Sequence, residues 1–146
     1  MRITSSAFRD GQPIPARYTC DGDDAIPPLA FEDVPAEAAS LVLIMDDPDA
    51  PGGTWDHWLI WNIAPQVRRI EEGKPPAGMF GKNSWGKTSW GGPCPPDREH
   101  RYFFKLYALD RMLHLREGSR KSELEKAMKE HVVAEAQLMG RYDRQR

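Results

Sequence analysis

Four polar residues that can donate, accept or carry protons lie in or beside apolar segments of the sequence: Asp47, His57, His100 and Tyr102. Taken singly, each has an ordinary structural explanation, because a carboxylate after a strand caps turn amides and a histidine in a strand often bonds to a backbone carbonyl. Together with the backbone amides of Gly91 and Gly92, they predict a small pocket rich in hydrogen-bond donors. Such a pocket suits an anion such as phosphate, sulfate or a carboxylate. The aspartate would fix a histidine tautomer and favour the imidazolium.

The same residues support an alternative function. Two histidines and one carboxylate can hold zinc or iron, so a metal-dependent hydrolase would use Asp47, His57 and His100. Strand-borne sets of this kind also serve as plain hydrogen-bond networks, and we favour a site without a metal or cofactor. The sequence has no Gly-X-Ser-X-Gly nucleophile elbow, and no base is demonstrably beside Cys94, although His100 follows six residues later. We therefore predict a binding protein with no catalytic residues, not an enzyme.

The stretch "GKNSWGKTSW" at 81–90 has the spacing of a phosphate-binding P-loop. A true P-loop follows a buried strand and runs directly into a helix, whose amides hold the phosphates. Here prolines and glycines lie on both sides, in "KPPAG" before it and "GGPCPP" after it, and they prevent both elements. We interpret the match as a coincidence in a glycine-rich loop.

The composition is that of a single globular domain spanning 1–146. A net charge of −2 gives no field that would attract nucleic acid, so no nucleic-acid partner is expected. No secretory signal is visible, and the longest apolar run, "LVLIM", is far too short to cross a bilayer. These features predict a cytoplasmic protein without an integral membrane segment. In that compartment Cys20 and Cys94 are expected as two reduced, half-buried thiols, and the alternative is a single disulfide, which the sequence alone does not establish.

Three strands are indicated by continuous apolar or aromatic runs, at 40–47, 54–63 and 101–110, and a first strand is expected within 2–8. One helix is predicted near the C-terminus. Ser122 and Glu125 fit a capping box. A mainly apolar stripe then recurs at spacings of three and four, before a stop at Gly140: Leu124, Ala127, Met128, His131, Val132, Ala136 and Met139. The pattern predicts an antiparallel all-β core with a peripheral helix, because helices do not alternate with strands.

Four segments resemble the phosphatidylethanolamine-binding protein family in their order and spacing: "DPDAP", "WDHWLIWNI", "GGPCPP" and "HRYFFKLYALD". The segment "YTCDGDDAIPPL" and the short C-terminus are similar to its bacterial and archaeal branch, the Raf-kinase-inhibitor-like proteins. The resemblance covers nearly the whole chain. It implies an antiparallel two-sheet β-sandwich of Greek-key type, with peripheral short helices and a C-terminal helix. It also implies an anion pocket lined by Asp47, His57, His100 and Tyr102, with walls shaped by Pro51, Trp55, Gly92 and Pro93.

The resemblance implies a partner that carries a phosphate or carboxylate, such as a phospholipid head group. It also implies a regulatory role as an inhibitor of a kinase or protease, and a homodimer, which no residue pattern requires. Cys94 and Pro95 are departures from the family's usual wall motif. Because Cys20 and Cys94 both lie in segments beside the pocket, the resemblance raises the hypothesis that they are close together or bonded.

Overall fold

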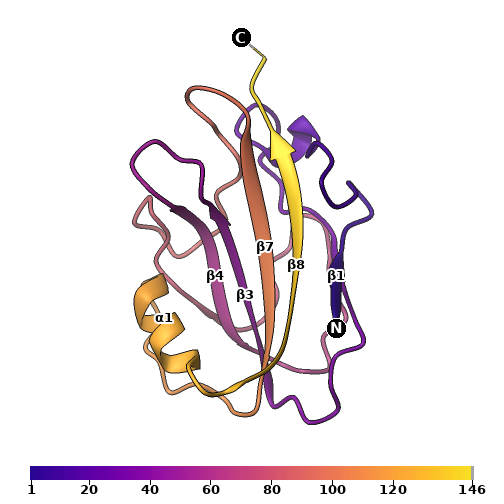
Figure 1. The fold of residues 1–146 in the computed structure, drawn as a ribbon, viewed down its shortest axis with the longest axis vertical. Coiled ribbons are helices and arrows are strands. Elements are labelled where there is room, and N and C mark those ends of the chain that lie inside the picture. The colour runs from indigo at the N-terminus through magenta and orange to yellow at the C-terminus, as the bar shows by residue number, and fades with distance from the viewer. Residues whose placement is uncertain (146) are drawn as a thin grey trace.

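The computed structural model describes residues 1–145 and contains two antiparallel sheets (Figure 1). The larger sheet has the order β6-β4-β3-β7-β8, formed by Met79–Phe80, Trp55–Ile63, Ser40–Asp47, His100–Leu109 and Val132–Tyr142. The smaller sheet has the order β1-β2-β5, formed by Arg2–Thr4, Leu29–Glu32 and Arg69–Ile70. Two short helices accompany them, η1 at Ala16–Tyr18 and α1 at Lys121–Met128. The prediction of a mainly β, two-sheet antiparallel fold is confirmed.

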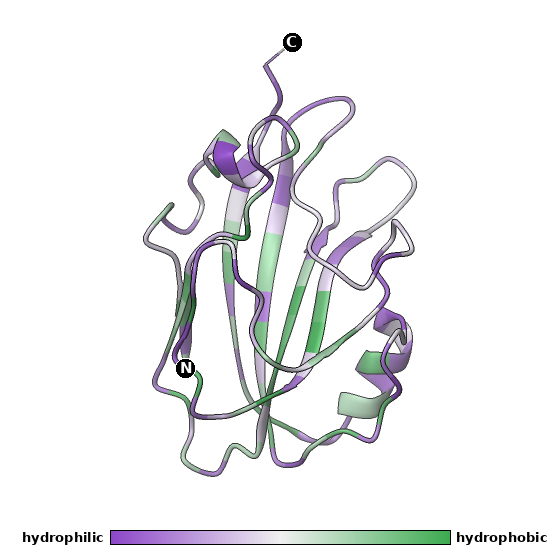
Figure 2. Ribbon diagram, turned by 180° about the vertical axis from the view of Figure 1, so that it is seen from behind, coloured by the Kyte–Doolittle hydropathy of each residue, from purple (hydrophilic) through white to green (hydrophobic). Residues whose placement is uncertain are grey.

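The three central strands β4, β3 and β7 are those with the strongest apolar patterns, and every residue of β3 is buried. One face of the large sheet packs on the small sheet, where Leu43 and Ile60 share a core with Phe31. The opposite face packs on α1, through Leu124 and Met128. Figure 2 shows the apolar residues in green along the middle of these strands. Because both faces of β3 are covered, its sequence is continuously apolar instead of alternating.

The predicted C-terminal helix is wrong beyond Met128. Glu130 adopts a left-handed φ of 72°, which ends helical continuation, and Val132–Tyr142 forms β8 along the edge of β7. Towards its end β8 buries every second residue, Leu138, Gly140 and Tyr142, which is the period of a strand. The spacings that suggested a helix therefore belong to two different elements.

The two ends predicted for that helix are wrong as well. The cap is made by Glu123, whose side chain accepts a hydrogen bond of 3.0 Å from the Arg120 backbone N–H, and not by the Ser122–Glu125 box. Gly140 is not a helix stop. A Cβ at this position would collide with the side chains of Ile14 and Phe8, so the glycine permits close packing under β8.

The N-terminal segment is also organised differently from the prediction. β1 ends at Thr4, and residues 10–14 then run along the outer edge of β8. The Gly11 N–H donates to Met139 O at 2.7 Å, and the Ile14 N–H donates to Arg141 O at 2.7 Å. This segment pairs with backbone groups near the end of β8, which would otherwise be an open edge of the large sheet.

Candidate ligand-binding site

One end of the large sheet carries the predicted polar residues. Because neighbouring strands are antiparallel, the end of β3 meets the beginnings of β4 and β7, with Asp47 paired to Trp55 and Asp46 paired to Phe103. The loop from β3 to β4 and the loop that leads into β7 lie over this end, at the top of Figure 1. They enclose a cavity of about 280 Å³. Its lining comprises Asp47, Ala50, Pro51, Gly52, Trp55, His57, Trp85, Cys94, Pro95, Pro96, His100 and Tyr102.

Six of the eight predicted site residues therefore meet in one cavity: Asp47, Pro51, Trp55, His57, His100 and Tyr102. Gly92 and Pro93 do not line it. They lie behind the wall, where the Gly92 N–H donates to Asp24 Oδ1 at 3.1 Å and Pro93 O accepts from the Cys20 N–H at 3.1 Å. A Cβ on Gly92 would collide with the Asp24 carboxylate, so this glycine is required for the contact between the two loops.

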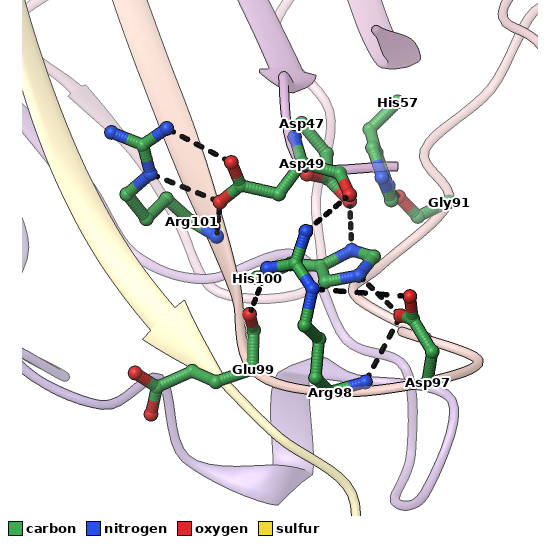
Figure 3. Close-up of polar contacts among 9 residues, drawn as sticks. All are labelled: Asp47, Asp49, His57, Gly91, Asp97, Arg98, Glu99, His100 and Arg101. Atoms are coloured by element: carbon green, nitrogen blue, oxygen red, sulfur yellow. Dashed lines mark hydrogen bonds and ion pairs between the residues drawn. The ribbon is translucent and has the colours of Figure 1, made fainter. Parts of the chain in front are cut away.

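His100 is buried between two carboxylates (Figure 3). Its Nδ1 lies 2.6 Å from Asp47 Oδ2, and its Nε2 lies 2.6 Å from Asp97 Oδ1. Ionised carboxylate oxygens only accept hydrogen bonds, so the ring can make both contacts at once only when both nitrogens carry protons. The hydrogen bond from His100 lowers the pKa of Asp97, so that carboxylate stays ionised at neutral pH. The Asp47 side chain is buried, whereas the Asp97 side chain is 44% exposed.

The turn after β3 holds Asp47 in place. Asp47 Oδ1 accepts a hydrogen bond of 2.8 Å from the Asp49 backbone N–H. Asp49 in turn binds the Arg101 guanidinium through two contacts of 2.9 Å and the Arg101 backbone N–H through a third of 2.9 Å. These hydrogen bonds, led by the one from the side chain, lower the pKa of Asp49 to about 2. The loop that carries Pro51 is thereby fastened to the first residues of β7.

His57 has a different environment from His100. It is 2% exposed, and its Nδ1 lies 2.7 Å from the Gly91 carbonyl oxygen. A carbonyl only accepts, so Nδ1 carries the proton in this contact. Burial lowers the pKa of His57, which favours the neutral ring at neutral pH. The sequence predicted that both histidines would direct N–H groups at a ligand. Here the one N–H of neutral His57 is already taken by Gly91.

The cavity lining holds one further donor, the Tyr102 hydroxyl. Burial raises the pKa of Tyr102 well above its usual range, and a hydrogen bond from the Cys94 backbone N–H only partly opposes this. The Tyr102 hydroxyl therefore keeps its proton, which it can donate. The indole N–H of Trp55 is buried and has no hydrogen-bond partner within residues 1–145. Buried donors without partners are rare, because each costs about 1–3 kcal/mol.

The segment that resembled a P-loop contributes Trp85 to the wall of the cavity. Asn83 organises it: its Oδ1 accepts from the backbone N–H groups of Trp85 and Lys87 at 2.9 and 3.0 Å, and its Nδ2 donates to Ser89 O at 2.9 Å. The element that comes directly after residue 88 is the strand β7, not the helix that a P-loop requires. Trp85, which is 43% exposed, stands edge-on to the His57 ring at a centroid distance of 4.9 Å. The loop is thus a wall over His57.

A disulfide joins Cys20 to Cys94, which lines the cavity. It fastens this part of the cavity wall to the segment after η1. It corrects the expectation of two reduced thiols and confirms the hypothesis, drawn from the resemblance, that the cysteines are bonded. Trp90 adds a parallel contact, with its indole Nε1 donating to Asp24 O at 3.0 Å. The wall is therefore held by one covalent bond and several hydrogen bonds.

Within residues 1–145, no group of three or more histidine, cysteine or acidic side chains is arranged to hold a metal ion. Asp47 and His100 bond to each other, and His57 bonds to a backbone carbonyl. In the same part of the chain, no helix is long and apolar enough to cross a membrane.

The sequence model described as "Phosphatidylethanolamine-binding protein" matches residues 4–143, which include every residue of the cavity. The chain belongs to the phosphatidylethanolamine-binding protein family. A UPF0098 protein of Methanothermobacter thermautotrophicus is 49% identical over 150 residues, covering 99% of both chains. A UPF0098 protein of Chlamydia trachomatis is 46% identical over 149 residues, again covering 99% of both chains.

Two solved structures of the phosphatidylethanolamine-binding protein family have the same fold. A homologue from Chlamydia trachomatis superposes with a TM-score of 0.96 at 46% identity, over 99% of this chain and 97% of that one. YbcL of Escherichia coli, described as a new member of the mammalian family, superposes with a TM-score of 0.90 at 27% identity, over 99% and 98%.

In this member of the phosphatidylethanolamine-binding protein family, sequence reasoning missed two residues that matter for the cavity. Asp97 was missed because a surface aspartate three residues before a strand has no distinguishing pattern. Trp85 lies in the segment that was examined for nucleotide binding, where an exposed tryptophan among glycines was the available signal.

Proposed function

We propose that the cavity binds a small anion that carries a phosphate or carboxylate group, without catalysing a reaction on it. The observation that carries this proposal is the contact between His100 and Asp97. A buried ring that lines the cavity binds a half-exposed carboxylate supplied by a loop residue. His100 Nε2 thus already contacts an anionic oxygen, that of Asp97. An incoming anion would replace the Asp97 carboxylate at this nitrogen.

The rest of the lining supports the same ligand class. Tyr102 O–H adds a neutral donor, and a low-dielectric surrounding strengthens hydrogen bonds to an anion. Proline and tryptophan side chains form the walls, and they suit an organic substituent attached to the anion. A phosphomonoester such as phosphoethanolamine has both parts.

The non-catalytic part of the proposal rests on the hydroxyl in the cavity. Because burial raises the pKa of Tyr102, its oxygen is not a nucleophile at neutral pH. Inhibition of a kinase or protease and a homodimer stay predictions that rest on the family resemblance. A cytoplasmic location stays a prediction that rests on the sequence showing no secretory signal.

A thermal-shift titration tests the proposal, because a ligand that binds only the native state raises the melting temperature with its concentration. The ligands would be phosphate, phosphoethanolamine, acetate and a nucleotide. His100→Asn is the informative variant, since an asparagine amide can still donate to Asp47 but lacks the outer nitrogen. His131→Asn is the matched control, since His131 pairs with Asp110 outside the cavity. We expect a shift with phosphoethanolamine that disappears only in His100→Asn. An equal shift in both variants, or no shift with any ligand, would refute the proposal.

A further inference from the structure

His57 is the buried titratable side chain of the cavity that the proposed function leaves without a role. Its ring stands edge-on to Trp85 at 4.9 Å and to Tyr102 at 5.3 Å, so it is held on two sides by aromatic rings. Its Nδ1 is fixed by the Gly91 carbonyl at 2.7 Å. The remaining nitrogen, Nε2, bonds to no group within residues 1–145, and it belongs to a side chain that lines the cavity.

Within residues 1–145 no acid contacts the His57 ring, and burial lowers its pKa by more than Asp47, Asp46 and Asp56 raise it from a distance. Asp47 is bonded to His100, and Asp46 is paired with Lys105 and Lys121. Asp56 is paired with Lys121 as well. From β7, the facing groups are His100, itself engaged with two carboxylates, and the neutral Tyr102. The loop from Trp85 to Gly91 contributes an indole face and a carbonyl. His57 therefore presents a lone pair on Nε2, which is a hydrogen-bond acceptor inside a cavity proposed to bind anions.

We propose, on the basis of the proposed function, that His57 makes the cavity selective for anions that carry an ionisable proton, and that its preferred ligands are phosphomonoesters. An acid O–H group of the ligand donates a hydrogen bond to Nε2, while the other oxygens accept hydrogen bonds from the donors of the cavity. An anion without such a proton places an oxygen lone pair against the nitrogen lone pair, and leaves a buried acceptor unsatisfied.

The proposal separates ligands that otherwise look alike. A phosphomonoester has its second pKa near 6, so close to that pH about half of it is a monoanion with one O–H. A sulfate ester has the same charge and nearly the same shape but no proton. A phosphodiester, as in an intact phospholipid head group, also has a single negative charge and no proton. We therefore expect free phosphomonoesters to bind in preference to the phosphodiester head group.

Isothermal titration calorimetry at pH 6 with three soluble ligands tests this inference: phosphoethanolamine, ethanolamine O-sulfate and glycerophosphoethanolamine. We expect the wild type to bind phosphoethanolamine roughly ten- to a hundredfold more tightly than the sulfate, which is the usual effect of leaving one buried polar group without a partner. Glycerophosphoethanolamine should resemble the sulfate. At pH 8, binding of phosphoethanolamine should take up about one proton, which titrations in buffers of different ionisation enthalpy reveal.

His57→Asn is the matched variant, because its amide can keep the hydrogen bond to Gly91 while Nε2 is lost. Its preference for phosphoethanolamine over the sulfate should fall to near one, whereas His131→Asn should keep the wild-type preference. Equal affinities for the three ligands in the wild type, or binding at pH 8 without proton uptake, would overturn the role of His57 and leave the anion-binding proposal standing. Absence of binding by all three ligands would overturn both. The proton-uptake measurement needs only the wild type, so it decides the question even if His57→Asn does not fold.

Discussion

Removing the Cys20–Cys94 disulfide should destabilise the protein by an amount that follows from its position in the chain. The cysteines are 74 residues apart, so the bond closes a long loop and restricts the unfolded chain strongly. The chain-entropy relation for a loop of this length gives about 4.5 kcal/mol at 25 °C. The entropy of unfolding of a chain of 146 residues is roughly 0.3 kcal/mol/K at about 2.1 cal/mol/K per residue, so the melting temperature should fall by about 15 °C.

The assay compares melting temperatures of the wild type with and without a reductant, and of the double variant Cys20→Ala, Cys94→Ala. The reduced wild type and the variant should melt at similar temperatures, and the variant should not respond to the reductant. Anion binding at low temperature should change little. The hydrogen bonds from Gly92 to Asp24 and from Cys20 to Pro93 still hold the wall when the protein is folded.

Two results would refute this reasoning. Thiol titration of the unreduced, denatured protein should detect no free thiol, and detection of two would show that the bond is not formed. If the bond is formed but reduction leaves the melting temperature unchanged, then the cross-link does not restrict the unfolded chain as the entropy model requires.

Three other substitutions test separate parts of the structure. Asp97→Asn removes the carboxylate that competes for His100, and should raise the affinity for phosphoethanolamine about two- to fivefold, as expected for a half-exposed pair; an unchanged or weaker affinity in calorimetry would contradict the displacement of Asp97. Asp49→Asn should cost on the order of 1 kcal/mol at pH 7, discounted because Arg101 is half-exposed. The folded-state pKa of Asp49, about 2, lies below the ordinary value near 3.9, so this stabilisation is present above pH 3.9 and is lost as the pH falls towards 2. Urea unfolding of both proteins at pH 7 and pH 2 should show the gap closing, and a constant gap would exclude the assigned ion pair. Gly140→Ala should destabilise by about 1–3 kcal/mol, because the new methyl group collides with packed side chains under β8; a neutral or stabilising effect on thermal unfolding would favour the helical interpretation of this region.

The central strands were predictable because burial on both faces forces a continuous apolar sequence, as in β3 and β4. The grouping of Asp47, His57 and His100 in one pocket was also predictable, because each lies in or beside an apolar segment, and the family resemblance added the residues of the walls. β8 was not predictable from periodicity. Its two alanines and its one methionine fit a helical stripe and an alternating strand equally well, and the unpaired edge of β7 decides between them.

The chemical state of the site depends on contacts between residues far apart in sequence. The tautomer of His57 is set by a carbonyl 34 residues away, at Gly91. The second partner of His100 is a loop carboxylate, Asp97, whose position depends on the path of the loop into β7. Residue types and spacing indicate which groups could form a site, but such contacts decide which of them donate and which accept.

The pairing of β8 determines when the cavity can be completed during synthesis. His100, at the start of β7, is paired with Tyr142 at the end of β8, and residues 10–14 close over the same stretch from the other side. The roughly 40 residues between His100 and Tyr142 take about 2–8 s to translate. Throughout that interval the edge of β7 that later pairs with β8 has no partner strand. Residues 10–14 likewise have no β8 edge to pair with. The cavity is therefore among the last parts of the nascent protein to mature, even though all of its lining residues have been made once residue 102 is added.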